Sequence, residues 1–153
     1  MLIVMGVAMG MVMVQLMPDK NAPLREEAAR LSLLLENAGL EARASGRSIA
    51  WSGEKSGYRF FNQNEYHDWV RIDDGSIFRP RNLPEGVYIG EISVEEQPVK
   101  PGEFVLLSAN SFAVPFNIRL NSAFGSAIVA GKSTGDVEYS LDEQPNTSAI
   151  PKP

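Results

Sequence analysis

The chain has 153 residues, of which 44% are hydrophobic and 22% are charged, which suits one domain with an ordinary core and argues against global disorder. The net charge is −5 at pH 7, which disfavours a nucleic-acid partner because phosphate binding needs clustered lysines and arginines. There is no cysteine and only one histidine, His67, so a disulfide, a thiolate nucleophile and a multi-histidine metal site within one chain are excluded.

Residues 1–17 differ in composition from the rest of the chain. All six methionines lie here, no residue is charged, and Gln15 is the only polar side chain. A secretory signal peptide, a buried helix of a soluble protein and a membrane helix all contain such an apolar run. We expect a membrane helix that lacks its first few residues, because the run begins at once and would span only about 25 Å.

Two glycines in this segment, Gly6 and Gly10, form a Gly-x-x-x-Gly pattern. This spacing lets two membrane helices approach closely, which makes both residues candidates for helix packing. Glycine is also common in membrane helices in general, so the pattern leaves both interpretations open.

Residues 18–44 predict an amphipathic stem helix. Two prolines punctuate its start, with Asp19 and Asn21 as candidate caps between them. Apolar residues then recur at steps of four and three, which places them in one stripe: Leu24, Ala28, Leu31, Leu35, Ala38 and Ala42. Gly46 is expected to end the helix, and the stripe must be buried against a sheet or another helix.

Residues 45–139 consist of short β-like runs, and together with the helix they predict an α+β fold. The runs are residues 48–52, 58–61, 69–72, 77–79, 87–94, 103–107, 116–120, 127–130 and 137–139. Turn signals separate them at Ser52-Gly53, Asp74-Gly75, Pro84-Glu85-Gly86, Lys100-Pro101-Gly102 and Gly135-Asp136. We expect antiparallel sheets arranged like a sandwich, with the stem helix packed on one face, and a loose tail over residues 140–153.

Two polar patterns could carry chemistry, but each has a simpler structural explanation. Asp73-Asp74-Gly75-Ser76 could supply oxygen ligands to calcium, yet it lacks the spaced acidic ligands of a calcium loop and fits a hairpin turn. His67 beside Asp68 could be an acid–base pair, but neighbours in a strand point to opposite faces. The sequence also lacks the signatures of serine hydrolases, phosphate loops and zinc proteases. We therefore expect no catalytic residue, no metal and no cofactor.

Charged residues form two groups in the middle of the chain. The positive group is Arg59, Arg71, Arg79 and Arg81, and the negative group is Glu91, Glu95, Glu96 and Glu103. Solvated strand faces with cross-strand pairing explain both groups, while the positive group could also face nucleic acid or an anionic protein. Opposite patches on one domain would suit head-to-tail packing in a filament, so both remain candidate protein-interaction patches.

Several short segments follow one another in an order typical of one protein family. They are Leu2-Ile3-Val4-Met5-Gly6 with the apolar run to Pro18, Arg25-Glu26-Glu27-Ala28-Ala29-Arg30-Leu31, Ala44-Ser45-Gly46-Arg47, Gly57-Tyr58-Arg59-Phe60, Trp69, and Ala113-Val114-Pro115-Phe116-Asn117-Ile118-Arg119-Leu120. Over residues 2–139 this series resembles the GspH/FimT group of type IV pilin-like proteins, and within it the minor pseudopilins of type II secretion systems.

The resemblance implies a structural protein with no enzymatic activity. It implies a single-pass inner-membrane protein with a periplasmic head, which joins other pseudopilins in a short filament that drives folded proteins through the outer membrane. Gly6 and Gly10 would then lie at helix contacts in the filament core. The family's leader, with its Gly-Phe-Thr-Leu cleavage region, and the glutamate early in the mature helix have no counterpart in this sequence. We therefore expect the natural start to lie further upstream.

A second branch of the same group, the FimT-like minor pilins, implies DNA binding for uptake. That branch is similar in having a basic region near the C-terminus, around a Gly-Arg-x-Arg stretch. The matching position here is Gly135-Asp136-Val137-Glu138, followed by Asp142 and Glu143, which places carboxylates where cations would be needed. Since carboxylates repel phosphate, the secretion subunit is the preferred interpretation and DNA binding the alternative.

Overall fold

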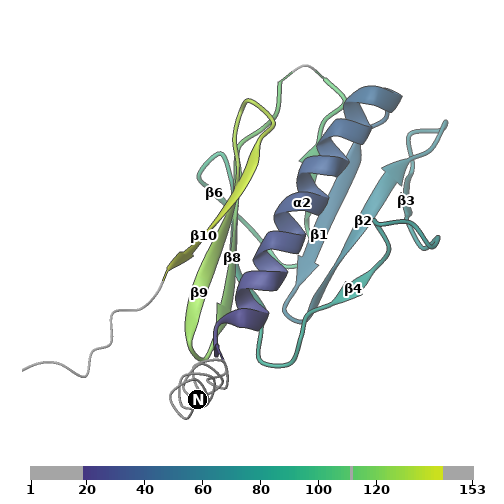
Figure 1. The fold of residues 1–153 in the computed structure, drawn as a ribbon. Coiled ribbons are helices and arrows are strands. Elements are labelled where there is room, and N and C mark those ends of the chain that lie inside the picture. The colour runs from purple at the N-terminus through teal and green to yellow at the C-terminus, as the bar shows by residue number, and fades with distance from the viewer. Residues whose placement is uncertain (1–18, 111, 143–153) are drawn as a thin grey trace, which may run out of the picture.

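The computed structural model describes residues 19–110 and 112–142, in which one long helix packs on two sheets that together contain ten β-strands (Figure 1). The helix is α2, Ala22–Ser45. The strands are β1 Ile49–Glu54, β2 Gly57–Gln63, β3 Trp69–Arg71, β4 Arg81–Asn82, β5 Tyr88–Val94, β6 Gln97–Val99, β7 Phe104–Leu107, β8 Phe116–Ser122, β9 Gly125–Gly131 and β10 Val137–Asp142. Every strand pair in these ranges is antiparallel, which confirms an α+β fold of one helix on antiparallel sheets.

The ends of α2 follow from local sequence. A proline occupies its first turn, where the missing N–H costs no hydrogen bond, and Gly46 follows its last residue with φ 71°, a left-handed conformation that favours glycine. All six residues of the predicted stripe are 0–1% exposed, so the amphipathic helix is confirmed. The cap differs from the prediction, because Asn21 makes no side-chain cap and its N–H donates instead to the Asp19 carboxylate at 3.0 Å.

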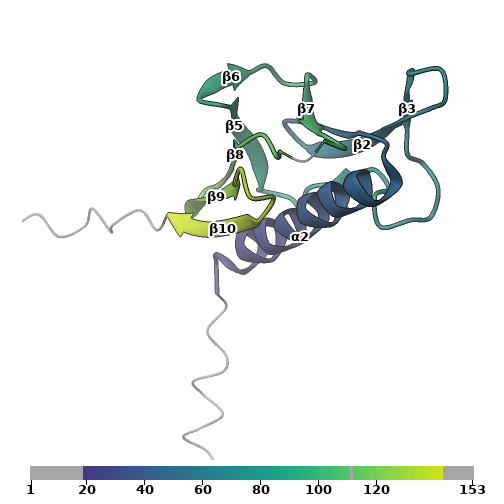
Figure 2. The same ribbon diagram turned by 90° about the horizontal axis from the view of Figure 1, so that it is seen from above.

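The strands form two five-stranded sheets that share α2. Sheet A has the order β3-β2-β1-β7, with β4 also paired to β2, and sheet B has the order β10-β9-β8-β5-β6. Figures 1 and 2 show α2 lying along one side of both sheets. Inward side chains such as Trp51, Phe60, Val105, Ile118 and Val129 meet the helix stripe in a single core. Because both sheets bury apolar surface against the same helix, helix and sheets are held together as one unit.

Gly53 was predicted to lie in a turn but lies inside a strand. The dipeptide Ser52-Gly53 predicts a turn, but Gly53 lies inside β1 and the chain turns at residues 55–56. A Cβ on Gly53 would lie 2.3 Å from the Trp51 ring, which packs over the same face of the strand. The glycine therefore makes room for the tryptophan.

Other predicted boundaries are also corrected. Residues 77–79, predicted as a strand, form a turn in which Arg79 N donates to Ser76 O at 3.3 Å. The short strands β4 and β6 are not predicted by the pattern, because β4 has 2 residues and β6 contains a proline. Strand β10 continues to Asp142, so the first residues of the predicted tail belong to sheet B.

No helix among the described residues is long and apolar enough to cross a membrane. The predicted membrane helix, residues 1–17, lies outside the described residues, and so do the candidate helix-packing residues Gly6 and Gly10. The part of the predicted tail beyond Asp142 lies outside them as well.

Candidate interaction surfaces

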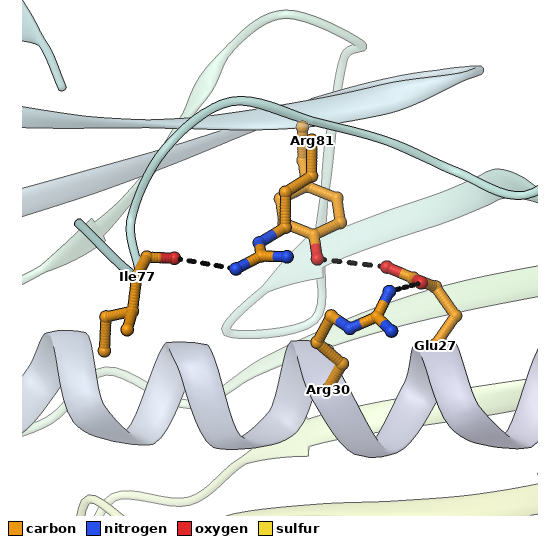
Figure 3. A network of polar contacts seen from close by, with 5 residues as sticks. Glu27, Arg30, Ile77 and Arg81 are labelled. Carbon is orange, nitrogen blue, oxygen red and sulfur yellow. Dashed lines mark hydrogen bonds and ion pairs between the residues drawn. The ribbon is translucent and has the colours of Figure 1, made fainter. Parts of the chain in front are cut away.

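A buried glutamate links α2 to sheet A. Glu27 lies on the inward side of the helix and is 1% exposed. Its Oε1 accepts a hydrogen bond from Tyr58 Oη of β2 at 3.0 Å, and its Oε2 forms an ion pair with Arg30 Nη1 at 2.7 Å (Figure 3). Both carboxylate oxygens therefore have a partner, which offsets the cost of burying the charge.

Tyr58 and Arg81 complete this network. Burial, together with the charge of Glu27, raises the pKa of Tyr58 above its ordinary value of 10.0, so the phenol keeps its proton and remains the donor. Arg81 lies opposite Tyr58 in the ladder between β4 and β2, which places both side chains on the same face. Arg81 Nη2 donates to Ile77 O at 3.3 Å, close to Glu27 and Arg30 (Figure 3). Arg81 thus belongs to the joint between helix and sheet.

The face of sheet A turned away from α2 carries exposed apolar side chains. Ala50 of β1 lies opposite Phe61 of β2 and opposite Leu106 of β7, so these side chains share one face. The ring centroid of Phe104 lies 4.8 Å from that of Phe61 and 5.5 Å from that of Trp69. Ala50 is fully buried although it is not part of the core under the helix, because these rings cover it. Phe61, Trp69, Phe104 and Leu106 are called the aromatic face.

The aromatic face is open to solvent and carries charges of both signs, because Glu54 of β1 shares it with Arg59. Phe104 is 41% exposed and Leu106 is 44% exposed. Arg59 lies on this face of β2, because it pairs with Ser52 in the same register that places Phe61 opposite Ala50. Arg59 is exposed and forms no ion pair within residues 19–110 and 112–142.

The four arginines of the predicted positive patch lie in three different places. Arg71 pairs with Phe61 in the β2–β3 ladder and therefore shares the aromatic face with Arg59, and its Nε contacts Asp73 Oδ1 at 2.7 Å. Arg79 is exposed in the turn before β4, and Arg81 points toward α2. Two of the four arginines thus flank the aromatic face.

The outer face of sheet B contains a hollow of about 580 Å³. Glu91 of β5 and Glu96 of the β5–β6 turn line it, together with Pro98, Arg119 and Ile128. We call this feature the acidic hollow. The other two members of the predicted negative patch, Glu95 and Glu103, do not line the acidic hollow.

Glu95 and Glu96 form the two-residue turn between β5 and β6, with φ values of 50° and 66°. Glu103 lies between the turn that follows β6 and the start of β7, where its Oε2 accepts a hydrogen bond from Lys100 N at 3.3 Å. The predicted negative patch is therefore divided between the acidic hollow and the entrance of β7.

The polar patterns with possible chemistry do not form a site in the described part of the chain. His67 is exposed at the tip of the β2–β3 hairpin with φ 65°, and Asp68 N donates to Asn64 Oδ1 at 2.9 Å. Asp74 Oδ1 accepts a hydrogen bond from Ser76 N at 3.4 Å, in a bend of the β3–β4 loop that replaces the predicted hairpin turn. Across the described ranges, no group of three or more His, Asp or Glu side chains could hold a metal ion.

The turn between β9 and β10 pairs its own charges. Lys132 Nζ lies 2.7 Å from Glu138 Oε1, and the Thr134 hydroxyl donates to Asp136 Oδ2 at 2.9 Å. The hydrogen bond and charge of Glu138 raise the pKa of Lys132. The single lysine of this turn is thus engaged with a carboxylate, while the Arg43 guanidinium of α2 lies beside Gly135 of the same turn.

No protein-family model and no curated protein matches this sequence. The structure is similar to two structures of the minor pseudopilin EpsH from the type II secretion system of Vibrio cholerae, with TM-scores of 0.62 and 0.65 and sequence identities of 14% and 12%. These matches cover 77% and 83% of this chain and 96% and 100% of EpsH. The solution structure of E. coli GspH matches with a TM-score of 0.59 and 19% identity, over 79% of this chain and 89% of GspH. The chain therefore has the pilin-like α+β fold of the minor pseudopilins, which confirms the predicted resemblance at the level of the fold.

Proposed function

We propose that this chain is a structural minor pseudopilin of a type II secretion system, which assembles into a periplasmic pseudopilus that drives the export of folded proteins. The observation that carries the proposal is the match of the fold to three pseudopilin structures over 89–100% of their length. A match over nearly whole domains supports a shared architecture, whereas a shared local motif would cover only a small part of them.

The joint between helix and head supports this role. A filament subunit must move its head together with its stem, so the two parts should be rigidly connected. The α2 stripe is buried against both sheets, and Glu27 adds a hydrogen bond from Tyr58 of β2 near the start of the helix. Because packed interiors are close to incompressible, displacement of such a stem carries the head with it.

The remaining elements of the proposal concern the membrane and the partners. Residues 1–17 would anchor the chain in the inner membrane, with Gly6 and Gly10 at contacts between helices and the head in the periplasm. The partners would be other pseudopilins of the same machine, selected by the charged surfaces of the heads. Neither catalysis nor a cofactor is part of this role.

Deletion of the gene in its source organism tests the proposal. Export of the secretion substrates should be lost, with the substrates retained in the periplasm, and the full chain supplied in trans should restore export. The full chain should also co-purify with other pseudopilins of that organism. Normal export after deletion would contradict the proposal. A salt-dependent shift of duplex DNA without any pseudopilin partner would also contradict it and would favour the DNA-binding alternative.

A further inference from the structure

We propose that one end of the head contacts the lipid–water interface of the membrane through two lysine–aromatic pairs. This end is called the base, and it consists of the start of α2, the start of β5, and the β1–β2 and β8–β9 turns. The inference rests on the proposed function, because it takes residues 1–17 as the membrane anchor. It goes beyond that function by assigning a lipid contact to the head itself.

Elements that are distant in the sequence meet at the base (Figure 1). A Cβ on Gly125, the first residue of β9, would lie 3.5 Å from Asn21 Oδ1, so the β8–β9 turn lies beside the start of α2. The ladder between β5 and β8 places the start of β5 beside the end of β8. Ile89 N of β5 donates to Lys55 O of the β1–β2 turn at 3.0 Å, which joins sheet A to the same end.

Each pair places an exposed ring beside an exposed lysine. Lys20 Nζ lies 5.3 Å from the ring centroid of Phe124 in the β8–β9 turn, and Lys55 Nζ lies 6.0 Å from that of Tyr88, the first residue of β5. The two aromatic residues are 54% and 41% exposed. Aromatic rings and lysine stems are apolar, whereas the ammonium and phenol groups are polar, and such side chains are favoured where hydrocarbon meets headgroups.

The position of the base along the chain places it at the depth of the headgroups. The uncharged segment ends at Met17, and Asp19 follows two residues later, at most about 7 Å further along an extended chain. The headgroup layer on each side of a bilayer is about 5–8 Å thick. When residues 1–17 lie in the hydrocarbon core, the start of α2 therefore lies within or directly above this layer.

Net charge does not hold the base to the membrane. Its exposed charged side chains are Asp19, Lys20, Arg25, Glu26, Glu54, Lys55, Glu85 and Asp142. Three positive charges thus stand against five negative ones, so anionic lipid is not attracted. A zwitterionic headgroup carries a phosphate and an ammonium group and can pair with charges of both signs. The contact is therefore with a zwitterionic lipid surface, and the two rings contribute its apolar part.

Two separate contacts fix the tilt of the head relative to the membrane. Strand β8 lies between β9 and β5, so Tyr88 lies about 10 Å to the side of β9. An anchor at the start of α2 alone lets the head tilt in any direction. A second contact about 10 Å away holds both sheets at one angle, since neighbouring strands are about 4.8 Å apart and move together. Subunits in the membrane then present their heads in one orientation before they join a filament.

The depth of a label in vesicles tests the contact. The chain has no cysteine, so Ser56→Cys provides a single site for a polarity-sensitive fluorophore in the exposed β1–β2 turn. The labelled full chain is reconstituted in phosphatidylcholine vesicles whose lipids carry bromine close to the headgroups. Bromine should quench this label. It should not quench a label on Ser133→Cys, an exposed position in the β9–β10 turn at the other end of sheet B.

Charge at the two ring positions should remove the contact. Phe124→Asp combined with Tyr88→Asp should abolish quenching of the label on Ser56→Cys, because a carboxylate is unfavourable in an apolar environment. Phe124→Ser combined with Tyr88→Ser should weaken quenching without a new charge. Phe112→Asp is the matched control, because Phe112 is 83% exposed before β8, away from the base, and should leave quenching unchanged. The emission of buried Trp51 checks that each variant is folded.

The lipid and salt dependence separates an apolar contact from attraction by charge. Quenching should be the same with and without anionic lipid. It should also persist at about 0.5 M salt, which screens exposed charges. A requirement for anionic lipid, or loss of quenching in salt, would overturn the inference.

Three further results would also overturn it: no quenching of the label on Ser56→Cys, quenching that survives the paired aspartates, or equal loss with Phe112→Asp. A label that responds only after another pseudopilin is added would make the base a partner surface instead. All of these results leave the proposed function intact, since export after deletion of the gene tests that separately. A full chain that does not float with vesicles would contradict the membrane anchor of the proposed function together with the inference.

Discussion

Replacement of Tyr58 by phenylalanine tests the joint between α2 and sheet A. The Tyr58 hydroxyl donates to Glu27 Oε1 at 3.0 Å, and the two residues are 2% and 1% exposed. The ring itself packs against Trp51 and Phe60, with centroid distances of 6.0 and 6.2 Å. Tyr58→Phe therefore removes one hydrogen bond and leaves the aromatic packing in place.

The expected loss in the free energy of unfolding follows from the charge of the acceptor, the Glu27 carboxylate. A hydrogen bond to a charged group contributes about 1.5–3 kcal/mol to stability. Glu27 keeps its ion pair with Arg30, whose side chain is 49% exposed, so the carboxylate retains one partner in the variant. We therefore expect Tyr58→Phe to lower the free energy of unfolding by about 2 kcal/mol, which corresponds to a fall in Tm of about 6 °C for a protein of this length.

Urea unfolding of the full chain, followed by the fluorescence of buried Trp51, measures this difference. Tyr66→Phe is the matched control, because Tyr66 is 83% exposed and its loss of a hydroxyl should change stability by less than about 0.5 kcal/mol. A Tyr58→Phe effect as small as that of the control would refute the reasoning, since the hydrogen bond to Glu27 would then contribute nothing.

Three further predictions use the same unfolding assay. Because the folded pKa of Tyr58 lies above 10.0, the unfolded chain loses the phenol proton first, so stability should fall above about pH 10 by up to about 1.4 kcal/mol per pH unit. Tyr58→Phe should lack this component, and equal slopes in both proteins would contradict the assignment. Gly131→Ala would place a Cβ 2.2 Å from the Phe116 ring and should cost about 1–3 kcal/mol, whereas unchanged stability would mean that the ring moves freely. Leu31→Ala, in the fully buried stripe, should cost about 2–5 kcal/mol, and exposed Leu33→Ala should cost much less; similar values would argue against the stripe as the core.

Local pattern was sufficient to predict the helix and most of the strands. The steps of four and three that define the α2 stripe depend only on helix geometry, and all of its members are buried. Glycines predicted turns less reliably, because a glycine is found both in turns and inside strands where a neighbouring side chain packs closely against the backbone. Gly46 ends α2 as predicted, whereas Gly53 lies within a strand under Trp51. The dipeptide Ser52-Gly53 alone does not show that the Trp51 ring packs over Gly53, and this contact is the reason for the glycine.

The joint around Glu27 shows why buried charge is difficult to predict. The residue borders the apolar stripe in a helix rich in charged residues, so its sequence position is typical of a solvated side chain. Its partner Tyr58 follows 31 residues later in β2, and only the packing of β2 against α2 brings the two together. Arg81 was likewise predicted to belong to an exposed patch, but the pairing of β4 with β2 places it beside Tyr58.

By itself, the sequence determined the local elements of this protein: one amphipathic stem helix, a series of short strands and the turns between most of them. The tertiary structure decided which side chains meet and which surfaces stay open. Phe61 and Phe104 form one aromatic face only because β7 joins sheet A beside β1. Alternation along a strand shows that one of its faces is buried, but the order and register of the strands decide which residues share that face.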